Sequence, residues 1–421
     1  MDVSTAFLAL GATIFVGFGA NYLFRKYGAP DILILIFLGF LFGPGALGVV
    51  DVGLAGNINS ITPYVAAIAL AIIMFEAGMD LKTSQVFGLF SRAMLQTILA
   101  FIMSMIAVAL LAVAFLGWSV SVALVLGAIL GGTSGAIVIP LVNRLKISDN
   151  TRTILTLESA LTDVLVIVVA TSMLVLVTDV SAGLDSAVRS LIVDFLVSAA
   201  VGLLAGVIWL FALTKLAGFP FSFIATLGVL VTAYAATDFI AGQAGAGAVA
   251  ALVFGLVLGN KETLARILRT NQDRFKIDGR IKDFNSEVSF FVRTFFFMYL
   301  GIVASTIIFT YSSLLFGVLV FAGLFLVRFI VSRLEKSSLQ LSRTDTLAFS
   351  LIMPRGLSAA VLASVPLTTH AVSVELGLMI LGTTVLVILM TTILASLGAY
   401  YIEKVDRQNK RNDATDANSQ G

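Results

Sequence analysis

The stretch LESALTDVLVIVVA, residues 157 to 170, places two acidic side chains inside a long apolar run. That run is long enough to cross a bilayer as a single helix. Asp163 lies 11 residues after Arg152 and 16 residues before Asp179, the flanking charges, which puts it near the middle of the membrane at about 1.5 Å of rise per residue. Because a carboxylate at that depth costs at least a few kcal/mol, we expect Glu158 and Asp163 to serve a function.

The helical spacing gives the two acids different neighbours. Ser159 and Asp163 share one face of the helix, whereas Glu158 and Thr162 share the adjoining face. One acid can therefore be neutralised by a buried cation while the other stays free to exchange a proton for another ion. In the alternative interpretation both acids reach water at the helix end, but the central position of Asp163 argues against it.

The composition is that of a membrane protein. Of 421 residues, 59% are hydrophobic and only 12% are charged, which predicts an all-α polytopic membrane protein. The absence of cysteine excludes disulfides and thiolate metal sites, and we expect no cofactor. The net charge of +2 gives no sign of a nucleic-acid partner, because the basic residues lie in loops and in the tail.

Hydrophobic length and loop signals predict about thirteen membrane-spanning helices. Their expected ranges are 4–24, 31–49, 62–80, 93–117, 120–143, 153–177, 190–214, 220–239, 244–259, 286–309, 312–332, 345–365 and 373–400.

Basic residues are concentrated in the loops that follow odd-numbered spans, whereas the other loops hold almost none apart from Arg189. This alternation predicts a protein of the cell membrane with its N-terminus outside and its C-terminus in the cytoplasm. Residues 261 to 285 are too charged to span the membrane and are expected to form a cytoplasmic linker helix. Residues 401 to 421 form a polar cytoplasmic tail, which we expect to be disordered from residue 407 onward.

Three short motifs recur in the same order at offsets of 216 to 224 residues. They are GTSGA at 132–136 with GLSAA at 356–360, the pair Gly39 and Gly43 with Gly255 and Gly259, and MFEAG ending at Gly78 with FMYLG ending at Gly301. The matches predict two inverted repeats, about 1–180 and 218–400, within one membrane domain of residues 1–400. Such repeats are typical of secondary transporters, which bind substrate at mid-membrane on interrupted helices.

The first predicted interruption is GGTSGAIVIP, residues 131 to 140, in which three glycines and a proline weaken the helix. We expect the hydroxyls of Thr133 and Ser134 to face a cavity there, although small residues also serve helix packing in any bundle.

The second interruption, MPRGLSAAVLA at 353–363, contains Arg355. A buried guanidinium needs a partner, and Glu158 is the best candidate. Arg328 lies near the cytoplasmic end of its predicted helix, where it could reach water, and is therefore the weaker candidate. Glu76, near the end of the third span, either lines the cytoplasmic entrance or simply faces water.

These residues predict a cation and proton site at Asp163. When ionised, its carboxylate offers hard oxygen to Na⁺ or K⁺, with neutral ligands from the hydroxyls of Ser159, Thr162, Thr133 and Ser134. When protonated, it repels the cation. Since burial and hydroxyl donors act on a carboxylate in opposite directions, such a group can be tuned to exchange protons near neutral pH.

The chain resembles the monovalent cation:proton antiporter superfamily, in particular its NhaP-like sodium/proton exchangers. The resemblance is carried by ESALTDVLVIV, PRGLSAAVLA, GAGAVAALVFGLVLGN at 245–260 and APDILILIFLGFLFGPG at 29–45. It implies that Asp163 is the cation and proton carboxylate and that Glu158 and Arg355 form a structural ion pair. It further implies a core domain of crossed, broken helices, a dimerisation domain, a homodimer, and alternating access by movement of the core.

Two departures leave the transported cation open. Thr162 stands where these exchangers usually carry Asn, and TSG at 133–135 stands where they usually carry Thr-Asp-Pro. TSG and the segment FEAGMDL are more similar to potassium-efflux relatives. The main prediction is a sodium/proton antiporter that accepts Na⁺ or Li⁺, and the alternative is potassium/proton exchange. With Asp163 alone titrating, we expect one proton per cation and electroneutral exchange.

Two other classes of function place different demands on the sequence. A sodium-coupled organic-anion symporter would need a basic residue facing the cavity, and Arg355, the one deep candidate, is unsuitable if Glu158 neutralises it. An intramembrane aspartyl hydrolase would need a second deep aspartate, whereas Asp238 lies near the end of its span. We therefore expect a transporter and not an enzyme.

Overall fold

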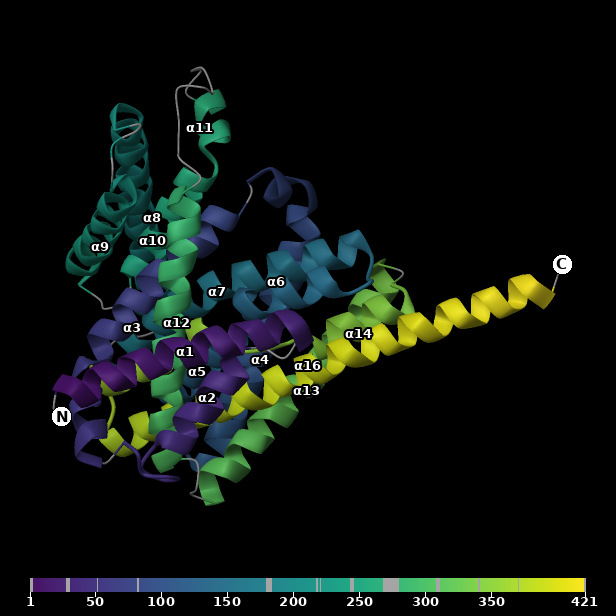
Figure 1. Ribbon diagram of the computed structural model, residues 1–421, viewed down its shortest axis with the longest axis horizontal. Coiled ribbons are helices and arrows are strands. Elements are labelled where there is room, and N and C mark those ends of the chain that lie inside the picture. Colours follow the sequence, from purple (N-terminus) through teal and green to yellow (C-terminus); the bar gives the residue numbers. More distant parts are fainter. Residues whose placement is uncertain are drawn as a thin grey trace.

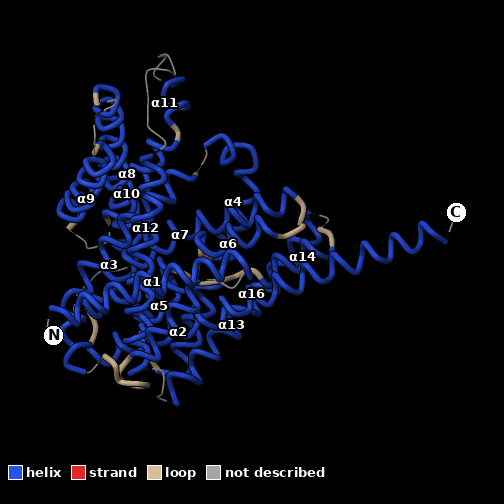
Figure 2. Tube along the Cα trace, in the orientation of Figure 1, coloured by secondary structure: helices blue, strands red, loops and turns tan. Residues whose placement is uncertain are grey.

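The computed structural model describes the chain except for residues 1–2, 28–30, 51, 82, 179–183, 217–218, 220, 243–245, 268–279, 308–310, 340, 370 and 420–421. Within the described ranges the protein is built from helices and loops and contains no strand (Figures 1 and 2). The sequence expectation of an all-α polytopic fold is thus confirmed.

The helices follow the predicted order closely. They are α1 (Val3–Tyr27), α2 (Asp31–Phe42), α3 (Val52–Asp80), α4 (Thr83–Leu116), α5 (Val120–Gly131), α6 (Gly135–Arg144), α7 (Asp149–Thr178), α8 (Leu184–Lys215), α9 (Ser222–Ala241), α10 (Gly247–Gly259), α11 (Lys261–Ile267), α12 (Arg280–Ile307), α13 (Tyr311–Leu339), α14 (Arg343–Leu351), α15 (Leu357–Thr368) and α16 (Val374–Ser419).

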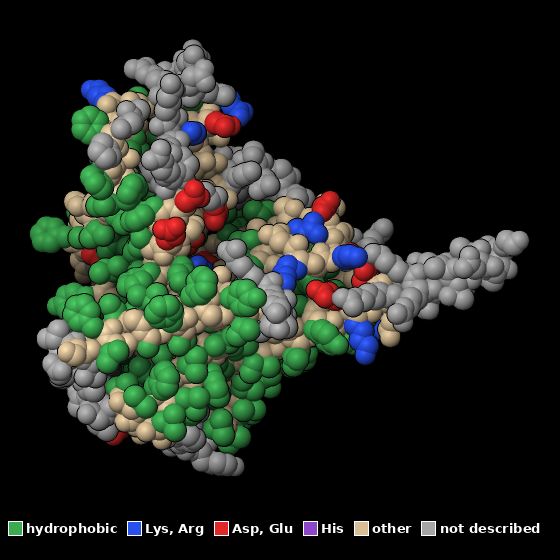
Figure 3. Space-filling view, in the orientation of Figure 1, with side chains coloured by type: hydrophobic (Ala, Val, Ile, Leu, Met, Phe, Trp, Pro, Cys, Tyr) green, Lys and Arg blue, Asp and Glu red, His purple; other side chains and the backbone are tan. Residues whose placement is uncertain are grey.

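Each of the thirteen predicted spans falls on one helix or on a broken pair. The span predicted at 120–143 is divided into α5 and α6, and the span predicted at 345–365 into α14 and α15. By length and composition, 8 helical segments of the described chain can cross a membrane, and 4 shorter apolar helices accompany them. Hydrophobic side chains cover much of the face in Figure 3, while charged side chains gather above them and toward α14.

Two predictions about the polar segments need correction or remain open. The linker helix expected over 261–285 is represented by α11, and α12 already begins at Arg280; residues 268–279 lie outside the described chain. The tail expected to be disordered from residue 407 is instead a continuation of α16, which runs to Ser419 and projects from the body (Figure 1). Residues 407 to 419 contain neither Gly nor Pro, and a helix already nucleated within the bundle extends at little further cost.

Glycine allows α2 and α12 to pack with their backbones in direct contact. A Cβ atom on Gly39 would lie 2.1 Å from the carbonyl oxygen of Met298, and one on Gly301 would lie 2.2 Å from that of Ile36. No side chain can be accommodated at such a separation, so both positions require glycine.

The pair α3 and α10 repeats this contact. A Cβ atom on Gly255 would lie 2.2 Å from the carbonyl oxygen of Phe75, and one on Gly78 would lie 2.1 Å from that of Leu252. These four residues correspond to the four residues of the α2 and α12 contact at the sequence offsets of 216 and 223 residues described above. Each predicted half therefore supplies one helix to both crossings.

The two helix interruptions also touch each other. The backbone N–H of Ser134, between α5 and α6, donates to the carbonyl of Pro354, between α14 and α15, at 2.8 Å. A Cβ atom on Gly356 would lie 2.0 Å from Oγ of Ser134, so the two breaks are in van der Waals contact. Both breaks contact α7, the helix that carries Glu158 and Asp163.

Candidate cation site

The carboxylate of Asp163 lies between the first residues of two half-helices. Its Oδ2 accepts a hydrogen bond from the backbone N–H of Gly135, the first residue of α6, at 3.2 Å. Its Oδ1 accepts from Oγ of Ser358, the second residue of α15, at 2.6 Å. Because a helix N-terminus carries partial positive charge and unpaired N–H groups, this arrangement stabilises an anionic carboxylate.

Ser159 borders the same carboxylate. A Cβ atom built on Gly135 would lie 3.3 Å from Oδ2 of Asp163 and 3.7 Å from Oγ of Ser159, so both side chains approach the start of α6. The Ser159 hydroxyl donates to the carbonyl of Thr156 at 3.0 Å, which leaves its oxygen lone pairs able to accept or to coordinate a cation.

Asp163 opens into a cavity of about 260 Å³. The charged side chains that line it are those of Asp163, Glu76, Asp80 and Arg293, and the polar lining includes Ser134 and Ser358. Glu76 therefore lines the cavity, and its Oε1 accepts a hydrogen bond from Oγ of Ser286 on α12 at 3.1 Å. Three carboxylates around one cavity make it attractive to cations.

Thr133 and Thr162 lie on the other side of the helix crossing and bind each other. Oγ1 of Thr162 accepts from the backbone N–H of Thr133 at 3.0 Å and lies 3.1 Å from the Thr133 carbonyl oxygen, to which it can donate. The Thr162 hydroxyl thus satisfies the backbone exposed by the break between α5 and α6. Neither threonine lines the 260 Å³ cavity; both border a small void of about 10 Å³ that is shared with Glu158.

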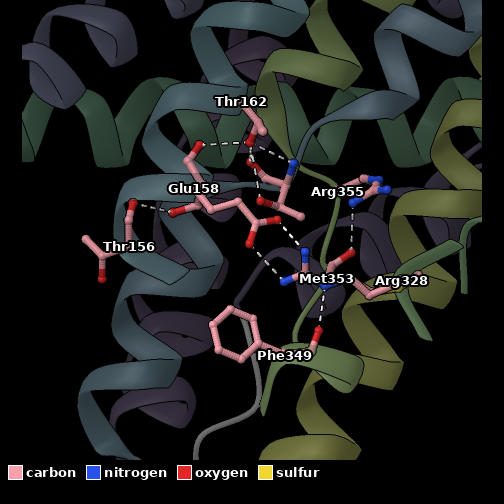
Figure 4. Close-up of polar contacts among 9 residues, drawn as sticks. Thr156, Glu158, Thr162, Arg328, Phe349, Met353 and Arg355 are labelled. Carbon is pink, nitrogen blue, oxygen red and sulfur yellow. Dashed lines mark hydrogen bonds and ion pairs between the residues drawn. The ribbon is translucent and has the colours of Figure 1, made fainter. Parts of the chain in front are cut away.

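The predicted pairing of Glu158 with Arg355 is corrected by the structure. Glu158 forms a two-pronged ion pair with Arg328 of α13, in which Arg328 Nη2 donates to Oε2 at 3.1 Å and Nη1 donates to Oε1 (Figure 4). Arg328 also donates from Nε to the carbonyl of Phe349, near the end of α14. The break after Leu351 leaves carbonyl groups at the end of α14 unpaired, and Arg328 satisfies one of them.

Arg355 lies beside this pair but has other partners. Its backbone N–H donates to Oγ1 of Thr391 at 3.0 Å, and its Nη1 donates to the carbonyl of Met353 at 3.3 Å (Figure 4). Within the described part of the chain, its Nε has no hydrogen-bond partner. The side chain is 3% exposed and borders the small void, not the cavity at Asp163.

Sequence reasoning missed three contributors to the site. Ser358 occupies the position in GLSAA that corresponds to Ser134 in GTSGA, so the repeat itself pointed to it. Gly135 contributes only a backbone N–H, which no side-chain pattern reveals. Arg293 lies inside a predicted span, and a basic residue at membrane depth is itself a signal.

Comparison with known proteins identifies the fold and the family. Residues 11–399 match the family described as sodium/hydrogen exchanger, transmembrane. The K(+)/H(+) antiporter NhaP of Alkalimonas amylolytica is 24% identical over 261 residues, which cover 61% of this chain but only 44% of that protein. Two structures of the sodium proton antiporter MjNhaP1 from Methanocaldococcus jannaschii, each 22% identical, give TM-scores of 0.76 and 0.73.

The structural likeness extends over the whole membrane region. The first MjNhaP1 structure covers 94% of this chain and is itself covered completely, and the second covers 96% with 97% of its own chain. The fold is thus that of NhaP antiporters, as the sequence resemblance implied. Since the family match takes in nearly all the helices, this multi-pass membrane protein belongs to the sodium/hydrogen exchanger family.

Proposed function

We propose that the protein exchanges Na⁺ or Li⁺ for H⁺ across the cell membrane, and that the cation and the proton compete for Asp163. The observation that carries this proposal is the position of its carboxylate, held by Gly135 and Ser358 at the ends of two half-helices and open to an acidic cavity. Hard carboxylate and hydroxyl oxygens suit small cations.

When ionised, Asp163 contributes carboxylate oxygen to the cation, and Ser159 and Ser134 are candidates for neutral ligands. Thr133 and Thr162 support the site by fixing the backbone of the break through their mutual hydrogen bonds. When a proton occupies Asp163, the attraction for the cation is lost. Each carboxylate then carries either one cation or one proton, so the exchange is electroneutral.

The ion pair of Glu158 and Arg328 is a structural element in this scheme. It carries no net charge, and both members are already neutralised and hydrogen bonded. It therefore stabilises the crossing of the broken helices without taking part in the exchange.

Access to the site changes as the crossed helices, together with α7, move against α3 and α12. With the N-terminus outside and the C-terminus in the cytoplasm, the cavity lined by Glu76 and Asp80 opens to the cytoplasm, and Glu76 stands at its entrance. We infer a homodimer as the working unit, as the family resemblance implies.

Potassium/proton exchange is the second candidate. It is favoured by TSG at 133–135, which places a serine where sodium/proton exchangers usually carry an acid, and by the name of the relative from Alkalimonas amylolytica. An organic-anion symporter is less well supported, because Arg355 does not line the cavity, and Arg293, which does, shares it with three carboxylates.

The test is proton flux in proteoliposomes with the membrane potential clamped, on addition of Na⁺, Li⁺ or K⁺. Wild type is expected to respond to at least one cation, and Asp163→Asn to none. Asp149→Asn, on the same helix but with a side chain that is 94% exposed, is the matched control and should retain wild-type flux. Full exchange by Asp163→Asn would refute the proposed site, and flux that follows the clamped voltage would refute electroneutrality.

A further inference from the structure

Arg293 is a positive charge in a cavity that is otherwise lined by acids. It extends from α12 into the space shared with Asp163, Glu76 and Asp80, and its side chain is only partly buried. Among the described residues, no carboxylate lies within ion-pair distance of its guanidinium. Glu76 is instead hydrogen bonded to Ser286, which lies two turns before Arg293 on the same helix.

Salt does not completely screen the charge of Arg293 from a cation bound at Asp163, because both lie at the same cavity. Opposite walls of a cavity of this size are separated by on the order of 10 Å, about one Debye length at physiological salt. At that separation, two unit charges alter each other's binding between about twofold in a water-like medium and about fifteenfold in the medium typical of a protein surface. A guanidinium is always charged, so this repulsion is permanent.

We propose that Arg293 sets the affinity and the charge selectivity of the cation site. On this inference, which rests on the exchange proposed above, Arg293 acts as a tethered counter-charge that weakens cation binding at Asp163 and discriminates against divalent cations. The Coulomb work grows in proportion to the charge of the ion. The factor by which Arg293 weakens the binding of a divalent cation is therefore about the square of the factor for a monovalent cation.

The test compares Arg293→Gln with Arg293→Lys, which retains the charge. In proteoliposomes, Arg293→Gln is expected to lower the half-saturating Na⁺ or K⁺ concentration between about twofold and about fifteenfold. Ca²⁺, used as the divalent probe, should inhibit this variant at concentrations lowered by about the square of that factor. Arg293→Lys should resemble wild type.

Arg333→Gln is the matched control for loss of one positive charge. Arg333 lies on α13, is exposed, and stacks over Phe329 at 4.6 Å, outside the cavity. Removing it should leave both concentrations unchanged, whereas an effect equal to that of Arg293→Gln would assign the change to the surface potential and overturn the inference.

A second readout does not depend on transport. Bound cation stabilises the folded protein, so the cation concentration that raises the melting temperature in detergent reports binding directly. Arg293→Gln should respond at lower Na⁺ and Ca²⁺ than wild type. If the half-saturating concentration is unchanged and only the maximal rate falls, Arg293 has a structural or gating role instead. The same conclusion follows if the fold-changes for Na⁺ and Ca²⁺ are equal. If wild type shows no Asp163-dependent exchange, the proposed function fails first and this inference falls with it.

Discussion

The carboxylate of Glu158 on α7 and the guanidinium of Arg328 on α13 form a two-pronged ion pair in the interior, where they are 4% and 6% exposed. The pair joins the helix that carries Asp163 to a helix outside the crossing. Arg328 also binds the carbonyl of Phe349, so the same guanidinium joins α7, α13 and the end of α14. Removing either charge leaves the other buried without its partner.

Glu158→Gln is therefore expected to lower the free energy of unfolding by about 3–5 kcal/mol. Thermal unfolding in detergent measures the change. Asp149→Asn is the control, because it removes an ion pair with Arg152 at the surface that is worth at most about 1 kcal/mol. A double-mutant cycle of Glu158→Gln with Arg328→Gln should show a larger coupling energy than a cycle with Arg355→Gln. The reverse order would contradict the pairing described here.

The choice between Arg328 and Arg355 marks the limit of what the sequence could predict. Hydrophobic length located the spans because the bilayer fixes how many apolar residues a helix needs. Hydrophobic length does not show toward which neighbouring helix a side chain points. Arg328 lies near the end of its predicted helix, where it could reach water, yet its helix packs so that the guanidinium reaches the carbonyl of Phe349 beside the break.

Asp163 was predictable because a carboxylate in an apolar run has few structural explanations. Ser134 and Thr133 were predictable as part of a weakened helix, but their separation onto two sides of the crossing was not, because it depends on how the two breaks touch. The glycine motifs predict the repeat, whereas the reciprocal backbone contacts that they make emerge only when all four helices are assembled.

Gly39→Ala is expected to destabilise the protein by about 1–3 kcal/mol, because the added methyl group would meet the Met298 carbonyl at 2.1 Å and the two helices would have to separate. Gly228→Ala on α9 is the matched control, since nothing lies within 4 Å of its added Cβ. That change should be neutral or slightly stabilising, as alanine is the better helix former. Melting temperatures in one detergent give the comparison, and equal shifts would mean that close packing at Gly39 is unimportant.

Ser358→Ala should move the pH at which exchange is half-maximal upward by about one to two units. The hydroxyl donates to Oδ1 of Asp163 at 2.6 Å. A hydrogen bond to a charged group contributes about 1.5–3 kcal/mol, and about 1.36 kcal/mol corresponds to a shift of one pH unit. Without this donor the carboxylate holds its proton to higher pH. Ser364→Ala, on the same helix but bonded to the carbonyl of Val361, should leave the pH profile unchanged. Equal shifts in both variants would refute the role of Ser358.

Competition at Asp163 makes a final prediction about how pH and cation concentration interact. If one proton and one cation exclude each other, the half-saturating cation concentration rises as pH falls, and reaches about a tenfold rise per pH unit at the acid limit. The maximal rate at saturating cation stays unaffected by this competition, since enough cation displaces the proton. Exchange measured between about pH 6 and about pH 9, with choline chloride holding the ionic strength constant, separates the two quantities. A maximal rate that falls with pH at constant half-saturation would instead place the proton on a group other than Asp163.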